Sequence, residues 1–356
     1  MTGVAVLAGL AGCGREEKEA GVGARPAGEG TNSPDGAQTQ PQAPQEQAGA
    51  GQSQTEKAQT PAQKTAEPAQ ASQHASQTEP ASQSAQPLPD LLVAEGGSPA
   101  RLVEKTLEGL GGIKRFVKPG NKVVLKPNIA WYRTPEQAAN TNPDIVAAVV
   151  RLCLGAGAKS VTVVEQTRDP WQACFQASGI QKAVEQAGGR IYAATRKEMY
   201  SEVPVPRGKA IDRESIVSDI LQADVFINIP IVKVHDSAVA VGGMKNLMGT
   251  VFRPGSYHVN LRGGLQQCIA DLSTVVRPNL IIADCYRVLV TGGPKGPGRV
   301  DTPGKVVAGI DPVAVDSYCM RFLNLKPEDV PHIKLAHQAG VGQMDTSHFR
   351  IQTVSA

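Results

Sequence analysis

One long stretch of this sequence cannot form a hydrophobic core. Between Gly23 and Pro87 there is no Ile, Leu, Val, Met, Phe, Tyr or Trp, and the segment consists mostly of Ala, Gln, Ser, Pro, Glu and Gly. Without large apolar side chains to bury, a chain cannot offset the conformational entropy that folding costs. We therefore predict that residues 14–87 form a disordered tether and that residues 88–356 form the folded domain.

The two parts of the chain carry opposite charges. Residues 1–90 hold five of the 36 Lys and Arg and ten of the 33 Asp and Glu, which gives −5 there and +8 over residues 91–356. A basic domain favours anionic ligands or surfaces. Nucleic acid is not an expected partner, because aromatic residues make up only 4% of the chain and no aromatic-basic interleaving occurs.

Residues 1–13 resemble a bacterial lipoprotein signal. A short apolar run from Val4 to Gly12 precedes Cys13, the position at which such proteins are lipidated. The run is too short to span a bilayer, which takes about 20 apolar residues. A basic region normally precedes such a run and none does here, so the natural start would lie upstream. The resemblance implies a lipid-anchored protein of the bacterial cell envelope; the alternative is a disordered N-terminus with an incidental cysteine.

From Leu91 onward, strand-like and helix-like segments alternate, which is typical of an α/β fold with a largely parallel sheet flanked by helices. The expected strands are 91–94, 122–125, 160–164, 190–193, 224–229, 280–283, 305–310 and 349–354. The expected helices are 98–111, 142–154, 170–187 with a break near 178–179, 214–222, 261–276, 311–322 and 329–338.

The stretch 229–249, IPIVKVHDSAVAVGGMKNLMG, concentrates the polar groups that chemistry requires. Lys233 and His235 are two residues apart, so in an extended chain both point to one side. The pair Gly242-Gly243 lets the backbone approach a ligand closely, and MKNLMG is expected to open a helix whose first amides face the same place. Together with Lys245 and Asn246 this pattern suits an anionic group. The alternative is a core histidine, two solvated lysines and a glycine turn.

Polar residues also follow other expected strands. Open α/β sheets bind ligands at the carboxyl ends of their strands. The residues at such ends are Lys126, Asn128, Glu165, Asn228 and Asp284. Asp311 is expected to cap a helix, and Asp316 is expected to face the site. The glycine-proline loop 292–299 either covers a ligand with its two cations or is an exposed mobile loop.

The cysteines after residue 13 do not indicate a metal cluster. They are five, with no CxxC pair, whereas zinc and iron-sulfur sites need clustered thiolates. They are expected to be buried small hydrophobic residues, although one disulfide remains open. They are Cys153, Cys174, Cys268, Cys285 and Cys319.

Several spaced motifs resemble the bacterial and archaeal family known as domain of unknown function 362. They are KPN at 126–128, DVFINIPIVKVH at 224–235, GGMKNLMG at 242–249, IIADCY at 281–286 with the loop that follows, and DPVAVD at 311–316. The resemblance implies a family but little chemistry. Many relatives carry an appended ferredoxin-like segment with clustered cysteines, which this chain lacks. The pattern H-x6-G-G-x-K from His235 to Lys245 is also similar to one in nickel-pincer lactate racemase-like proteins.

We therefore expect an enzyme-like domain that acts on a small anionic substrate, with or without a metal. Its cofactor- or substrate-binding residues would be Lys126, Asn128, Lys233, Gly242, Gly243 and Asn246, and its catalytic residues His235, Lys245 and Asp316. His235 suits proton transfer or metal ligation, with Asp316 or Glu165 fixing its tautomer. One alternative is a tethered binding protein for an anionic solute or metal ion. Another is a module whose basic face rests on anionic lipid or cell-wall polymer.

Overall fold

The computed structural model describes residues 88–253, 255, 257 and 264–356. The predicted signal peptide (1–13) and the predicted tether (14–87) lie outside the described residues, as does His258, a histidine thirteen residues after Lys245.

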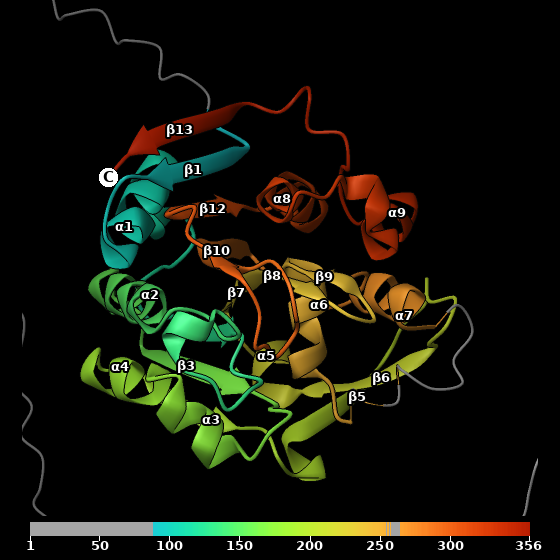
Figure 1. Cartoon of the computed structure of the whole chain (residues 1–356). Coiled ribbons are helices and arrows are strands. Elements are labelled where there is room, and N and C mark those ends of the chain that lie inside the picture. The colour runs from blue at the N-terminus through green and yellow to red at the C-terminus, as the bar shows by residue number, and fades with distance from the viewer. Residues whose placement is uncertain (1–87, 254, 256, 258–263) are drawn as a thin grey trace, which may run out of the picture. The chain divides into compact units, whose positions relative to one another are not determined.

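The elements alternate along the chain (Figure 1). The strands are β1 (Leu91–Glu95), β2 (Lys122–Pro127), β3 (Ser160–Glu165), β4 (Arg190–Ala193), β5 (Tyr200–Pro204), β6 (Arg213–Val217), β7 (Val225–Ile229), β8 (Ile231–His235), β9 (Val239–Val241), β10 (Leu280–Leu289), β11 (Val300–Asp301), β12 (Lys305–Gly309) and β13 (Ile351–Ser355). The α-helices are α1 (Pro99–Gly109), α2 (Pro143–Gly155), α3 (Trp171–Ala177), α4 (Ile180–Gln186), α5 (Ser218–Leu221), α6 (Gly243–Asn246), α7 (Gly264–Leu272), α8 (Pro312–Cys319) and α9 (Pro331–Gln338).

One large sheet organises the described part of the chain, in the order β13-β1-β12-β10-β7-β2-β3-β4. Strands β10, β7, β2, β3 and β4 run parallel to one another, as do β1 and β13, and β12 runs antiparallel to both β1 and β10. Strand β8 pairs parallel with the C-terminal part of β10, and β9 pairs antiparallel with β8. The sequence prediction of a largely parallel sheet with flanking helices is therefore confirmed.

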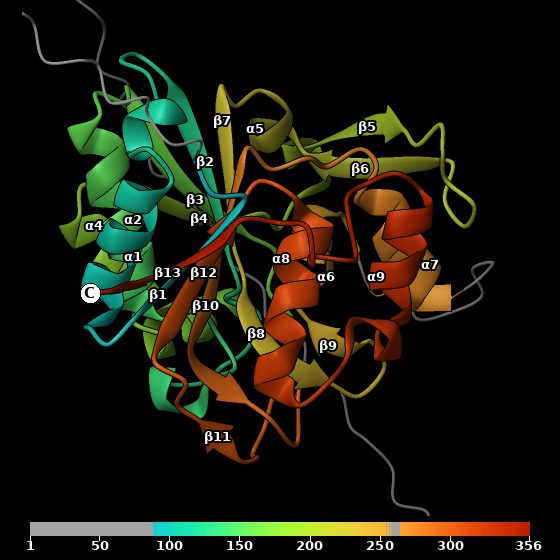
Figure 2. The same ribbon diagram turned by 90° about the horizontal axis from the view of Figure 1, so that it is seen from above.

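Alternate residues of the strands enter two separate cores. In β2, Val123 and Leu125 pack in the core beneath α1, α2 and α4, whereas Val124 packs in the core beneath α6, α7, α8 and α9. This alternation follows from the two-residue period of a strand. Figure 2 shows α1, α2 and α4 on one side of the sheet and α6 to α9 on the other.

Three helices begin as their sequences predict, with a polar cap before a proline. The side chains of Ser98, Asn142 and Asp311 each accept a hydrogen bond from a backbone amide of the first turn. The proline that follows each cap has no N–H to leave unsatisfied. The chain breaks between α3 and α4 at Gly179, whose φ of 70° lies in the left-handed region, as the expected break near 178–179 requires.

Two helix predictions need correction. The helix expected at 214–222 is instead strand β6 followed by the single turn α5. Strand β6 pairs antiparallel with β5, a strand that was not expected. Pairing between strands can override the helical preference of a short segment. The helix expected at 261–276 runs from Gly264 to Leu272, and 261–263 lie outside the described residues.

The order of strands reverses at the centre of the sheet. From β2 the chain moves to β3 and β4 on one side, and it returns to place β7 and β10 on the other. Ligands of open α/β folds bind at the carboxyl ends of strands at such a reversal. Lys126 of β2 lies in register with Asn228 of β7 at this point, and both face the helices α6 to α9, as Val124 and Phe226 do.

Candidate functional site

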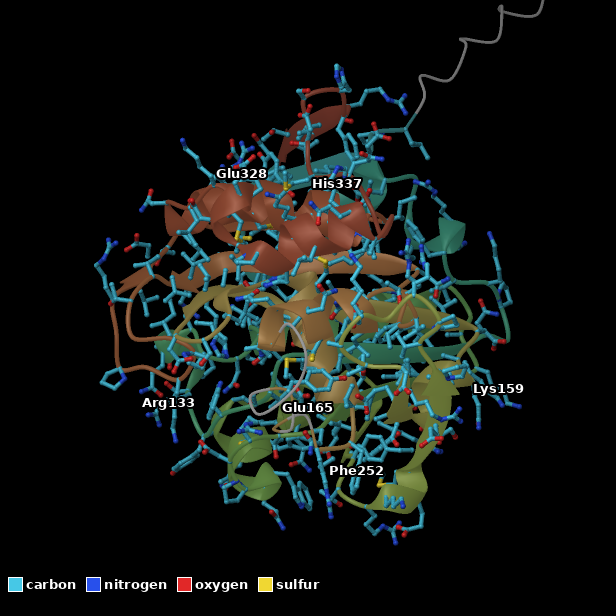
Figure 3. The ribbon with its side chains drawn as sticks, turned by 90° about the vertical axis from the view of Figure 1, so that its right-hand side faces the viewer. Arg133, Lys159, Glu165, Phe252, Glu328 and His337 are labelled. Atoms are coloured by element: carbon cyan, nitrogen blue, oxygen red, sulfur yellow. The ribbon has the colours of Figure 1, made fainter. Side chains whose placement is uncertain are left out.

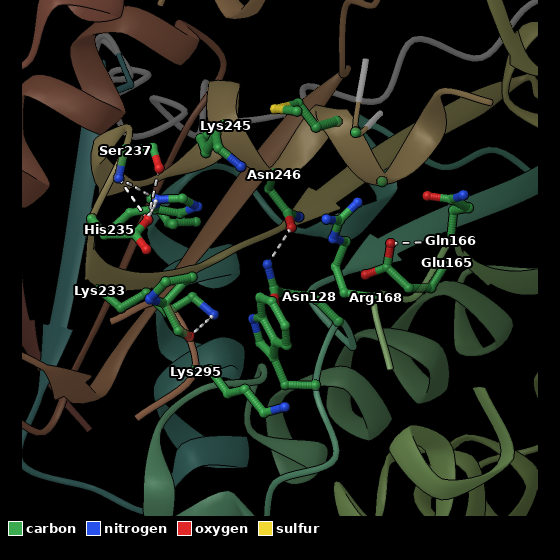
Figure 4. A pocket seen from close by; sticks show the side chains of 18 of the residues that line it. Asn128, Glu165, Gln166, Arg168, Lys233, His235, Ser237, Lys245, Asn246 and Lys295 are labelled. Atoms are coloured by element: carbon green, nitrogen blue, oxygen red, sulfur yellow. Dashed lines mark hydrogen bonds and ion pairs between the residues drawn. The ribbon is translucent and has the colours of Figure 1, made fainter. Parts of the chain in front are cut away.

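A pocket of about 440 Å³ opens where β2, β3 and β8 end and α6 begins (Figure 4). This volume is in the range that holds a small molecule. Five cationic side chains and two carboxylates line it, so its formal charge is +3 with histidine neutral. The cations are Lys126, Arg168, Lys233, Lys245 and Lys295, and the carboxylates are Glu165 and Asp236.

The floor of the pocket is a buried ion pair. Lys126 Nζ lies 2.9 Å from both carboxylate oxygens of Glu165, and neither residue is more than 1% exposed. Glu165 also accepts hydrogen bonds from the amides of Ile129 at 2.7 Å and Gln166 at 2.9 Å. Burial lowers the pKa of Lys126 and raises that of Glu165, and the attraction within the pair opposes both shifts. Figure 3 shows Glu165 near the middle of the molecule and Lys159 at its edge.

Three asparagines form a chain of hydrogen bonds beside this pair. Asn228 Nδ2 donates to Gly243 O at 2.8 Å, and Asn246 Nδ2 donates to Asn228 Oδ1 at 2.8 Å and to Lys126 O at 3.0 Å. Asn128 Nδ2 completes the chain by donating to Asn246 Oδ1 at 3.0 Å. Residues from β2, β7 and α6 are thereby held together, although they lie up to 120 positions apart in the sequence.

The other side of the pocket carries lysines without carboxylate partners. Lys233 is 1% exposed, and its Nζ donates to the backbone oxygens of Ala139 at 2.5 Å and Pro294 at 2.9 Å. Within the described part of the chain, the side chain of Lys245 has neither a hydrogen bond nor an ion pair. Burial, followed by the neighbouring charge of Lys245, holds the pKa of Lys233 well below its usual value. Burial, followed by the charges of Arg168 and Lys126, lowers the pKa of Lys245 to about 8.

His235 ends β8 with its side chain only 8% exposed, on the same side of the strand as Lys233. Its Nδ1 lies 2.8 Å from Asp236 Oδ1 and also 3.1 and 3.2 Å from the amides of Ser237 and Ala238. The carboxylate stabilises a proton on Nδ1, and the amides stabilise a bare Nδ1, so the surroundings serve both protonation states. The carboxylate beside His235 is therefore that of Asp236, whereas the sequence analysis expected Asp316 or Glu165 to fix the tautomer of this histidine.

The glycine pair and Asp316 are close to each other and do not line the pocket. Asp316 Oδ1 accepts from the Gly243 amide at 2.5 Å and Oδ2 from the Met244 amide at 3.0 Å. A Cβ atom on Gly242 would collide with this carboxylate. The glycines therefore allow a close approach to Asp316, whereas the sequence prediction was an approach to a ligand. Burial raises the pKa of Asp316 to about 7, although these hydrogen bonds lower it.

The remaining strand-end residues divide between the site and the scaffold. Lys126, Asn128 and Glu165 line the pocket, and Asn228 lies behind Asn246 of α6, which also lines it. Asp284 accepts from the amides of Asn142 and Tyr286, which fixes the start of α2. Burial raises the pKa of Asp284 to about 6, and its two hydrogen bonds oppose the shift.

Several pocket residues were not predicted. Arg168 and Asp236 come from loops that follow strands. Lys295 is one of the two cations of the glycine-proline loop, for which covering a ligand was one of two predictions. Lys295 Nζ lies 3.2 Å from Asp169 and 5.5 Å from the centre of the Trp131 ring, and Pro294 O accepts from Lys233. The loop thus closes one side of the pocket, in line with the prediction that it covers a ligand and not with the alternative of an exposed mobile loop. Arg168 lies in the loop between β3 and α3, three residues after Glu165, and no periodic pattern marks its direction there.

No three His, Cys, Asp or Glu residues of the described segments gather in a way that could hold a metal ion. The metal role considered for His235 stays a prediction. The five cysteines named above are buried and unpaired, with Cys285 Sγ 3.8 Å from Cys319 Sγ. Within the described residues no helix has the length and apolarity needed to cross a membrane.

Comparison with known proteins finds one curated relative and two solved structures of note. The chain is 28% identical over 261 residues to a thylakoid-associated protein of Synechocystis sp., covering 69% of this chain and 77% of that protein. The lactate racemase apoprotein of Thermoanaerobacterium thermosaccharolyticum matches with 12% identity and a TM-score of 0.41, over 69% of this chain and 56% of its own. A protein of Thermotoga maritima matches with 12% identity and a TM-score of 0.39, over 68% of this chain and 60% of that protein.

The family assignment rests on the sequence, since both structural matches are distant and this chain spans less than two thirds of either structure. The model of the family described as "Domain of unknown function (DUF362)" matches residues 123–321, which include all but the first residue of β2, the pocket-lining segments and α8. The chain belongs to this family.

Proposed function

We propose that this domain binds a small anion with more than one negative charge and acts on it by proton transfer. The observation that carries the proposal is the presence of Lys233 and Lys245 in one pocket without a carboxylate partner for either. Unpaired buried cations are costly unless a ligand supplies the opposite charge. Ionisable groups with strongly shifted pKa values in a cleft are typical of functional sites.

Each side chain has a role that its geometry supports. Lys233, Lys245 and the guanidinium of Arg168 neutralise the anion, and Asn128 and Asn246 orient it. His235 transfers the proton, because Asp236 and the neighbouring amides accommodate its two protonation states. The pair Lys126–Glu165 holds the floor of the pocket in place.

The binding step can be tested with malonate, a dianion small enough for the pocket. Calorimetric titration of the full chain should show binding that weakens by at least about tenfold in Lys233→Met and in Lys245→Met, since each loses a charge contact. Lys182→Met is the matched control, because Lys182 is exposed on α4 and does not line the pocket. Equal affinity in all four proteins would contradict the proposal.

Catalysis and binding separate at His235. In a catalyst, His235→Ala abolishes turnover of the natural substrate and leaves malonate affinity within about threefold of wild type, because the histidine acts on the proton and not on the charge. A tethered binding protein, the alternative function, would lose affinity through the lysines alone and show no turnover with any anion. A surface module would show steep salt dependence without saturable binding of malonate.

We further propose that the domain is attached to the bacterial envelope through a lipid on Cys13. The relative from Synechocystis sp. is named for association with thylakoids, which is a membrane location, and this similarity supports the proposal. Detergent phase partitioning of the full chain, expressed in bacteria with a basic region placed before Val4, should place it in the detergent phase, and Cys13→Ser should move it to the aqueous phase. An unchanged distribution in Cys13→Ser would contradict the anchor.

A further inference from the structure

The chain of three asparagines has a fixed direction. Gly243 O can only accept, so the group that Asn228 presents to it at 2.8 Å is its NH₂. Asn228 Oδ1 therefore faces Asn246, whose NH₂ donates to it and also to Lys126 O. The carbonyl oxygen of Asn246 is left facing Lys126 Nζ at 3.4 Å and Asn128 Nδ2 at 3.0 Å.

This direction determines which atom of Asn128 is left over. Rotating its amide by 180° would bring two carbonyl oxygens together at the present 3.0 Å distance, so the NH₂ must face Asn246. Its Oδ1 is then an acceptor, and it is buried with no donor among the described residues. Asn128 itself is 8% exposed and lines the pocket, where Figure 4 shows it opposite Asn246.

A second acceptor of the same kind borders the pocket. Gln166 Oε1 is also buried without a donor in the described part of the chain, and Gln166 follows Glu165 at the end of β3. Buried carbonyl oxygens nearly always have a hydrogen-bond partner, and the exceptions call for an explanation. No hydrogen bond among the described residues fixes which way round the Gln166 amide lies, so the acceptor that needs a donor from the occupant is the buried carbonyl oxygen of Asn128, a residue of the pocket lining.

The charge of the pocket decides which donor fits. A hydroxyl and an ammonium group both donate to a carbonyl oxygen, but the pocket lining already carries a formal charge of +3. An ammonium group would be repelled by Lys233 and Lys245, whereas a neutral hydroxyl would not. We infer that the substrate is a hydroxylated anion whose hydroxyl group donates to Asn128 Oδ1. This inference rests on the proposed function, since it names the class of anion that the same pocket selects.

Three dicarboxylates that differ at one carbon test the inference: malonate, hydroxymalonate and aminomalonate. Calorimetry of the full chain at pH 7.5 should show hydroxymalonate binding at least about tenfold more tightly than malonate, because only the first satisfies the buried acceptor. Aminomalonate should bind more weakly than hydroxymalonate. In Asn128→Ala the ratio of the hydroxymalonate to the malonate affinity should fall to about one.

The ratio separates this role from a structural one. Asn128→Asp keeps an oxygen at this position but adds a negative charge. The affinities for malonate and hydroxymalonate should therefore both fall, while the ratio of the hydroxymalonate to the malonate affinity stays above the ratio in Asn128→Ala. Gln176→Ala, on the exposed surface of α3, should keep the wild-type ratio. Equal binding of malonate and hydroxymalonate by wild type, or a preference that survives in Asn128→Ala, would overturn the inference and leave the proposed function standing. Failure of all three probes to bind would overturn the proposed function itself.

Discussion

The two sides of the pocket use lysine in opposite ways. On the β2–β3 side, Lys126 lies against Glu165, and that carboxylate receives two backbone amides as well. On the β8–α6 side, Lys233 meets only two backbone carbonyls, and Lys245 has no acceptor within the described residues. The first side is electrostatically complete without a ligand, and the second is not.

The difference separates scaffold from function. Breaking a complete buried pair leaves one unpaired charge, which destabilises the fold. Removing Lys245, whose side chain has no partner among the described residues, leaves nothing unpaired, so its loss should affect binding and not folding. Removing Lys233 leaves only two neutral backbone oxygens without a donor and no unpaired charge. Lysines that look equivalent in the sequence are thus predicted to differ in what their substitution damages.

The largest effect on stability is expected on the β2–β3 side, where Lys126 is paired with Glu165. Lys126→Met should lower the free energy of unfolding by about 3–5 kcal/mol, because Glu165 stays buried without its partner. Urea unfolding of the full chain measures this change. The double variant Lys126→Met, Glu165→Leu should recover much of the loss, because no charge is left. A loss no larger than that of Lys182→Met would show that the pair is not a structural unit.

An intermediate effect is expected behind the pocket. Asp316→Ala should lower the free energy of unfolding by about 1–3 kcal/mol, since the amides of Gly243 and Met244 lose their acceptor. Malonate affinity should change by less than about threefold if Asp316 acts only through the backbone of α6. Unchanged stability with a large loss of affinity would place Asp316 in the site, as the sequence analysis expected.

The pKa of Asp316 gives a pH dependence with a definite sign. Its folded pKa of about 7 lies above the ordinary 3.8, so between these values the native state binds more protons than the unfolded state. The stabilisation from the protonated carboxyl is complete below pH 4 and is lost as the pH rises through 7. Unfolding free energies of wild type relative to Asp316→Asn should therefore fall from pH 4 to pH 8. A difference that stays constant with pH would contradict the assignment.

The smallest effect on stability is expected on the incomplete side. Lys245→Met should leave the free energy of unfolding unchanged or raise it by about 1 kcal/mol, because residues placed for function often cost stability. The same urea unfolding experiment measures it at pH 7. A loss comparable to that of Lys126→Met would mean that Lys245 has a structural partner, and the contrast between the two sides would disappear.

The sequence predicted the fold and much of the pocket lining because both depend on local pattern. The apolar run 224–229 ended by Pro230 became β7, and the two-residue spacing of Lys233 and His235 placed both on one side of β8. Lys126 and Asn128 were predicted from their place after a strand, and the strand-order reversal brings them to Asn246.

The rest depends on contacts that local pattern does not encode. A glycine pair signals that something approaches the backbone closely, but not that the approaching group is Asp316 from α8. Local pattern predicts a helix at β6 because it does not encode the pairing of β6 with β5, a short strand without a buried residue. Arg168, Asp236 and Lys295 lie outside regular strands and helices, where sequence periodicity does not set the direction of a side chain.

Proton uptake on anion binding tests the central claim most directly. At pH 8.5 a lysine with a pKa of about 8 is mostly neutral, and an incoming anion should raise that pKa and draw a proton from solution. Calorimetric titration of the full chain with malonate, in two buffers of different ionisation enthalpy, counts the protons. We predict net uptake by wild type and a clearly smaller uptake by Lys245→Met. Saturable binding of malonate without proton uptake, or equal uptake by both proteins, would contradict the account.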